Sequence, residues 1–85
     1  MFTVEDETHS EPGAEFTTKE EALVELHRLA TLPWDKPPNR APCTSWQTCG
    51  RRYALVEYDQ RYTPWRRLSS VTMLDVSSKG ARWLP

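Results

Sequence analysis

Apolar residues between positions 18 and 31 recur with the spacing of one helix face, which is i, i+1, i+4, i+7 and i+8. They are Ala22, Leu23, Leu26, Leu29 and Ala30. Thr18 followed by Glu21 makes a capping box, in which each side chain bonds the backbone N–H of the other residue. Pro33 cannot continue a helix and disfavours helical geometry at the residue before it. The sequence therefore predicts one amphipathic helix over residues 18–31.

Three further segments have the composition or alternation of β-strands. Phe2 and Val4 alternate with polar neighbours, which predicts a short strand with one buried face. Residues 53–58 are rich in aromatic and β-branched side chains, which favour a pleated surface. Residues 66–76 give another strand, but its apolar phase slips at positions 69–70. We expect a bulge or a bend at that slip.

Shorter signals complete the prediction. Residues 77–80 read as a hairpin turn, 81–84 as a short edge strand and 14–16 as a strand stub or a lead into the helix. The order is strand, helix, long loop and three strands. A single amphipathic helix must bury its stripe against one face of the sheet. We therefore predict a single α+β domain over residues 1–85, a two-layer sandwich with one helix on three or four mostly antiparallel strands.

One pairing in this prediction depends on strand order. If the first strand lies beside residues 53–58, its crossover is expected to be parallel and right-handed. The later strands are joined by short links and are expected to be antiparallel.

The segment 33–50 has no periodicity, yet it carries four prolines, Trp34 and Trp46. Connections of this length in compact domains are usually functional or floppy. Two tryptophans argue against a floppy segment, because an exposed indole is costly and a buried one fixes the backbone around it. One interpretation is that the segment forms a contact surface. The other is an Ω-like loop whose tryptophans pack into the core, and we favour this second interpretation for the loop itself.

The two cysteines, Cys43 and Cys49, are spaced C-x5-C, which matches neither a C-x-x-C redox motif nor a zinc knuckle. The acidic N-terminus and the lack of a long apolar run suggest the cytoplasm and no membrane span, so we expect reduced thiols. A Cys₂His₂ zinc site with His9 and His27 is conceivable, but no spacing supports it. We expect no metal and no cofactor.

Charge is segregated along the chain, although the net charge is only −1. Residues 1–38 hold nine acidic and three basic residues, whereas residues 39–85 hold three acidic and eight basic ones. Six of the nine aromatic residues lie in the basic part. An arginine-rich aromatic face could bind single-stranded nucleic acid. We favour internal pairing of the two charge excesses, because nucleic-acid-binding domains usually carry a clear positive excess.

Catalysis has little support, because no nucleophile has a base at recognisable spacing and no phosphate-binding loop is present. We predict a non-catalytic protein-interaction module, either a monomer or a weak homodimer, that binds another protein. Its candidate contact residues are Trp34, Arg40, Trp46, Arg51 and Arg52. The nucleic-acid alternative would use Tyr58, Arg61, Trp65, Arg66, Arg67, Arg82 and Trp83. A thiol-dependent enzyme or redox protein is the third alternative.

Overall fold

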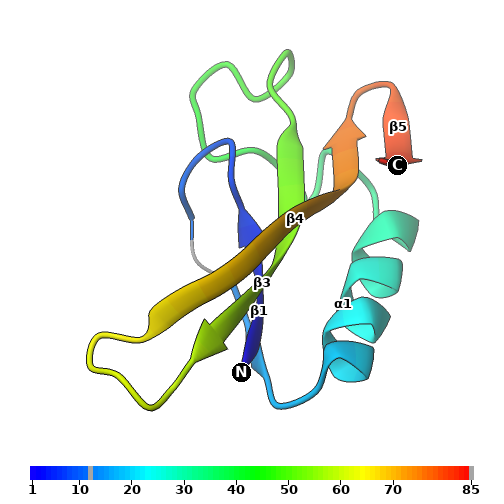
Figure 1. Ribbon diagram of the computed structural model, residues 1–85. Helices are drawn as coiled ribbons and strands as arrows, with labels where there is room; N and C mark the ends of the chain where they lie inside the picture. Colours follow the sequence, from blue (N-terminus) through cyan, green and yellow to red (C-terminus); the bar gives the residue numbers. More distant parts are fainter. Residues whose placement is uncertain (12, 85) are drawn as a thin grey trace.

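The computed structural model describes residues 1–11 and 13–84, which form one helix packed on a five-stranded antiparallel sheet (Figure 1). The elements are β1 (Phe2–Asp6), β2 (Glu15–Phe16), α1 (Lys19–Thr31), β3 (Arg51–Asp59), β4 (Arg66–Ser77) and β5 (Gly80–Trp83). The strands lie in the order β2-β1-β3-β4-β5. The predicted small α+β sandwich is confirmed, with slightly more strands than the expected three or four.

Helix α1 begins and ends where its sequence signals lie. The Thr18 side chain caps the first turn by accepting the backbone N–H of Glu21 at 3.2 Å. Hydroxyl hydrogen bonds from Thr17 and Thr18 lower the pKa of the Glu21 carboxyl below its ordinary value. At the other end, the backbone N–H of Leu32 donates to Leu29 O, and Pro33 follows. The predicted helix is therefore confirmed to within one residue at its start.

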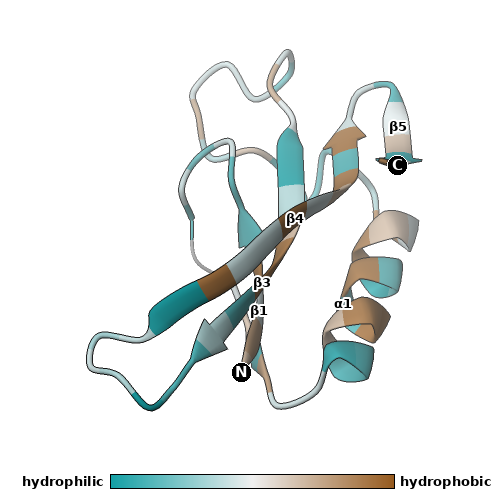
Figure 2. Ribbon diagram, viewed as in Figure 1, coloured by the Kyte–Doolittle hydropathy of each residue, from teal (hydrophilic) through white to brown (hydrophobic). Residues whose placement is uncertain are grey.

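The core lies between the helix and one face of the sheet. Ala22, Leu26 and Leu29 are buried on α1 and belong to one cluster with Val4 of β1 and Leu55 of β3. The apolar stripe of α1 faces the sheet in Figure 2. Fully burying one leucine contributes about 2 kcal/mol, so this stripe is what holds the helix in place.

The pairing of β1 with β3 is antiparallel, so the parallel crossover expected for this neighbour pair is wrong. The reason is the two-residue strand β2, which returns the chain beside β1 before the helix begins. Helix α1 then runs back toward the far end of β1, and the loop of residues 33–50 delivers the chain there (Figure 1). Strand β3 consequently starts where β1 ends.

Strand β4 is 12 residues long and is bulged at two places relative to β3. The register shifts lie opposite Tyr53/Ala54 and Glu57/Tyr58, which leaves Met73 and Leu68 as the extra residues. The irregularity expected at positions 69–70 therefore falls one residue earlier, and a second one was not foreseen. Within residues 1–11 and 13–84, the structure contains no helix that has both the length and the apolar character of a membrane span.

Candidate functional site

A buried arginine organises the end of the molecule where β1 finishes and β3 begins. Arg51 is 7% exposed, and its Nη1 donates to Asp6 Oδ2 and to Glu11 Oε1, both at 2.9 Å. The same guanidinium donates from Nη2 to Arg40 O at 2.8 Å and from Nε to Asn39 O at 3.2 Å. Arg51 thus joins β1, β3 and the loop of residues 33–50 through one side chain.

Asn39 extends this network to the helix. Its Nδ2 donates to the carbonyls of Leu29 at 2.8 Å and Leu32 at 3.2 Å, which satisfies carbonyls at the end of α1. Its Oδ1 accepts the Tyr53 hydroxyl at 2.9 Å. Burial raises the pKa of the Tyr53 phenol to about 12. Among the described residues, no buried side-chain nitrogen or oxygen is left without a hydrogen-bond partner.

Three of the predicted contact residues come together in the loop of residues 33–50. The rings of Trp34 and Trp46 lie 5.7 Å apart, and the Arg40 guanidinium lies 4.3 Å above the Trp46 ring. Trp34 also packs against the hydrophobic core, and both indoles are partly buried. The loop is therefore an ordered structure closed by its own aromatic–arginine stack.

The other two predicted contact residues lie apart from this stack. Arg51 is buried in the network described above, so no partner can reach its guanidinium without unfolding that network. Arg52 is the next residue along β3 and is exposed, because successive strand residues point to opposite faces. The sequence analysis did not identify Asp6 as a buried residue. Its place two residues after Val4 was the available signal that it points inward.

The structure joins Cys43 and Cys49 in a disulfide, so the expectation of two reduced thiols is wrong for this structure. Both cysteines belong to the same loop, and a turn with Cys49 N–H bonded to Ser45 O brings them together. His27, the second histidine of the conceivable zinc site, lies on α1 with its ring 4.8 Å from Trp83. It does not join the other three residues.

The β3–β4 hairpin projects from the rest of the molecule (Figure 1). We call its residues 58–71 the hairpin arm. The last β3 residue paired with β1 is Glu57, and Tyr58 exchanges backbone hydrogen bonds with Met1. Beyond Tyr58, β3 and β4 pair only with each other. The arm contains four of the six exposed large hydrophobic residues of the described chain. They are Tyr62, Trp65, Leu68 and Val71. The sequence places Leu68 and Val71 in the predicted strand of residues 66–76, but it does not show that β4 extends beyond the helix.

The residues of the nucleic-acid alternative divide between two ends of the sheet. Tyr58, Arg61, Trp65, Arg66 and Arg67 belong to the hairpin arm. The remaining pair lies on β5, which pairs with the opposite end of β4 (Figure 1). That pair is Arg82 and Trp83.

Most of the arginines in this set have acidic partners within the chain. Arg61 Nη2 donates to Asp59 Oδ2 at 2.7 Å, and hydrogen bonds from Arg61 lower the pKa of Asp59 to about 2. Arg67 contacts Glu5 at 3.5 Å, and Arg82 contacts Asp75 at 3.3 Å. Of these three pairs only Arg67–Glu5 joins the basic residues 39–85 to the acidic residues 1–38; the other two lie within residues 39–85.

A small cleft lies between α1 and the Arg51 network. Its volume is about 190 Å³, and its charged lining includes Glu11, Glu25 and Arg28. Pockets for drug-sized ligands are usually about 300–1,000 Å³. Arg28 is already engaged, since its guanidinium donates to both carboxylate oxygens of Glu25. The cleft therefore gives little support to a small-molecule site.

No family model, no curated protein and no solved structure matches this chain.

Proposed function

We propose that this protein is a non-catalytic module that binds another protein through its hairpin arm. The observation that carries this proposal is the gathering of Tyr62, Trp65, Leu68 and Val71, which are 37% to 54% exposed, on one projecting hairpin. Exposed apolar residues that cluster mark interaction surfaces, whereas single ones are ordinary. Tyrosine, tryptophan and arginine are also the residues most enriched at binding hot spots.

The charge of the arm defines the partner that would fit. It carries Arg61, Arg66 and Arg67 and one acid, Asp59. Arg61 pairs with Asp59 and Arg67 contacts Glu5 of β1, so Arg66 is the arm's cation without an ion pair among the described residues. The Arg66 guanidinium lies 5.6 Å from the Tyr62 ring centroid, beside the exposed apolar residues. We therefore infer a partner protein whose surface presents apolar residues bordered by carboxylates.

The arm supports this proposal better than the loop of residues 33–50 does. In the loop, Trp34 packs on the core and Arg40 covers Trp46, so those groups already have partners within the chain. The nucleic-acid alternative is less supported, because Arg67 is paired and because Arg82 and Trp83 lie at the far end of the sheet.

The test compares three forms of the full chain as immobilised bait in native cell extract. They are the wild type, the arm variant Trp65→Ser/Leu68→Ser and the control Val24→Ser, which changes a residue that is 69% exposed on α1. A protein recovered by wild type and control is then purified and titrated by calorimetry. We expect the arm variant to weaken that binding by about 30-fold, the effect of losing a hot spot.

Two results would overturn the proposal. Equal binding by the arm variant would remove the arm as the contact surface. Binding of single-stranded RNA or DNA near 50 mM salt, with affinity that falls steeply as salt rises, would instead establish the nucleic-acid alternative. Sedimentation of the purified wild type and arm variant identifies the third outcome, a homodimer that forms through the arm.

A further inference from the structure

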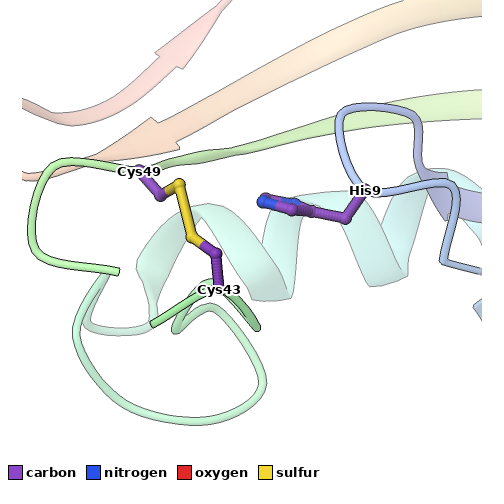
Figure 3. Close-up of side chains that lie close together, drawn as sticks. All are labelled: His9, Cys43 and Cys49. Carbon is purple, nitrogen blue, oxygen red and sulfur yellow. A yellow bond between two sulfur atoms is a disulfide. The ribbon is translucent and has the colours of Figure 1, made fainter. Parts of the chain in front are cut away.

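Three potential metal ligands meet beside the Arg51 network. His9 lies in the turn after β1, and Cys43 and Cys49 lie in the loop of residues 33–50 (Figure 3). One ligand atom from each residue lies within 4.8 Å of the other two, and all three residues are partly buried. In Figure 3 the nitrogen-bearing end of the His9 ring points toward the two sulfur atoms.

The histidine is held as a metal-binding histidine is held. Its Nδ1 lies 2.7 Å from Asp6 Oδ2, which leaves Nε2 as the nitrogen available to a metal. Metal-bound histidines almost always donate their other ring N–H to a carboxylate or a carbonyl, which fixes both the tautomer and the ring orientation. The Asp6 side chain is only 2% exposed, so this orienting contact is shielded from water.

The same carboxylate connects both halves of the cluster. Asp6 accepts Arg51 Nη1 at 2.9 Å, and Arg51 follows Cys49 by two residues along the chain. Arg51 also binds the carbonyl of Arg40, three residues before Cys43. The segments that carry the histidine and the cysteines are therefore anchored to one buried ion pair before any metal arrives.

We propose that Cys43, Cys49 and His9 form a zinc site when the disulfide is reduced. Two thiolates and one imidazole are ligands that zinc prefers, whereas calcium and magnesium require oxygen ligands. The Cα atoms of the two cysteines are 7.2 Å apart. Bridged cysteines usually have Cα atoms about 4.4–6.8 Å apart, so this spacing suits two sulfurs on either side of an ion.

The site has three ligands from this chain. Among the described residues, no fourth histidine, cysteine or carboxylate belongs to the cluster. Zinc binds four ligands in a tetrahedron, so its fourth position would hold water or a side chain of another molecule.

Zinc binding in this site depends on the oxidation state of the sulfurs. A small thiol reductant supplies two electrons: two reductant thiols become one reductant disulfide, and the Cys43–Cys49 bond becomes two protein thiols. Zn²⁺ then displaces one proton from each thiol and binds two thiolates and His9. In the oxidised chain both sulfurs are consumed by the S–S bond, which leaves His9 alone. The oxidised protein is therefore expected not to retain zinc.

The test titrates ZnCl₂ into the reduced and the oxidised full chain by calorimetry, in buffers of different ionisation enthalpy. We expect the reduced wild type to bind one ion with release of protons, and the oxidised form to bind at least 100-fold more weakly. Cobalt(II) bound to the reduced protein should show thiolate-to-metal charge-transfer absorption. Circular dichroism establishes that every variant remains folded.

Single-residue variants separate this site from adventitious binding. His9→Ala keeps the Asp6–Arg51 pair and should weaken zinc binding by at least tenfold, while His27→Ala, the matched control, should bind as the wild type does. Cys43→Ser should lower the cobalt charge-transfer absorption to that of at most one thiolate. The proposal is overturned if reduced wild type and His9→Ala bind zinc equally, or if the reduced and oxidised chains do so. The first result would remove His9 from the site, and the second would remove the two cysteines.

Discussion

The two ends of β3 differ in burial and in hydrogen bonding. At its start, Arg51 and Tyr53 are buried and every polar atom of their side chains has a partner. At its end, the hairpin arm of residues 58–71 leaves large apolar side chains in solvent. Strand β3 thus runs from a buried, fully hydrogen-bonded region to a region whose apolar side chains are exposed. We expect substitutions at its start to lower the stability of the fold, and substitutions at its end to weaken binding.

The comparison also separates two uses of arginine. The Arg51 guanidinium is desolvated, and its charge must be compensated by protein partners because an unpaired buried charge strongly destabilises the fold. Arg61, by contrast, has a side chain that is 83% exposed while it contacts Asp59. Exposed ion pairs contribute little, since solvent and salt screen them. Hydrogen bonds made by an arginine therefore matter more for stability at the start of β3 than in the hairpin arm.

Replacing Arg51 should have the largest effect. We expect Arg51→Met to lower the free energy of unfolding by about 3–5 kcal/mol, because Asp6 would keep a buried charge without its cation. Urea unfolding followed by circular dichroism measures the loss. Arg52→Met is the matched control on the exposed face and should change stability by less than about 0.5 kcal/mol. Similar losses for the two variants would contradict the structural role given to Arg51.

The Tyr53 phenol should make the rigid end sensitive to alkali. Its pKa is raised from 10.0 to about 12 by burial, so the folded state keeps a proton that the unfolded state gives up more readily. Its contribution to stability is complete below pH 10 and is lost as pH rises through 12. Tyr53→Phe should be less stable at pH 8 by about 1 kcal/mol, from the lost bond to Asn39, but should lose less between pH 10 and 12. Parallel unfolding curves for both proteins at each pH would contradict this.

The hairpin arm should tolerate substitutions that the core does not. Leu68→Ser removes a side chain that is 54% exposed and should change the unfolding free energy by less than about 0.5 kcal/mol. Leu26→Ala, at a fully buried position of α1, should lower it by about 2–5 kcal/mol. Amide hydrogen exchange should be faster in residues 58–67 than in residues 53–56. A large loss from Leu68→Ser would mean that the arm is packed and not available to a partner.

The rigid end and the arm were not equally predictable from the sequence. The helix follows from local signals, because the Thr18 side chain caps its start and Pro33 ends it within a few residues of the apolar stripe. The Glu21 carboxylate accepts the Thr17 and Thr18 hydroxyls, not the Thr18 backbone N–H that a full capping box predicts. The Arg51–Asp6 pair joins residues 45 positions apart, so no local spacing reveals it. The direction of β3 depended on β2, a strand of two residues, and the sequence left residues 14–16 as either a strand stub or a lead into the helix. Local periodicity therefore predicted the elements, while long-range pairing decided which charges were buried.

The exposure of the hairpin arm could not be predicted from the sequence for a different reason. Leu68 and Val71 have the alternation and composition of an ordinary strand. Composition does not show which strand extends beyond the helix that packs on the sheet. Only the pairing of β1 with β3, which ends at Glu57, shows where the β3–β4 hairpin extends beyond β1. Leu68 lies beyond that point, whereas Val71 pairs with Leu55, within the part of β3 that pairs with β1.

The smallest effect is expected at the Asp59–Arg61 pair of the arm. Hydrogen bonds from Arg61 lower the pKa of Asp59 from 3.8 to about 2, so this pair favours folding above pH 3.8 and loses that contribution as pH falls through 2. Arg61→Gln should return the Asp59 pKa toward 3.8, which an NMR titration of the carboxyl measures directly. Because the Arg61 side chain is largely exposed, the unfolding midpoint at pH 7 should barely move. A marked loss of stability at pH 7 would show that charge pairs matter as much in the arm as at the buried end, and the contrast between the two ends of β3 would then fail.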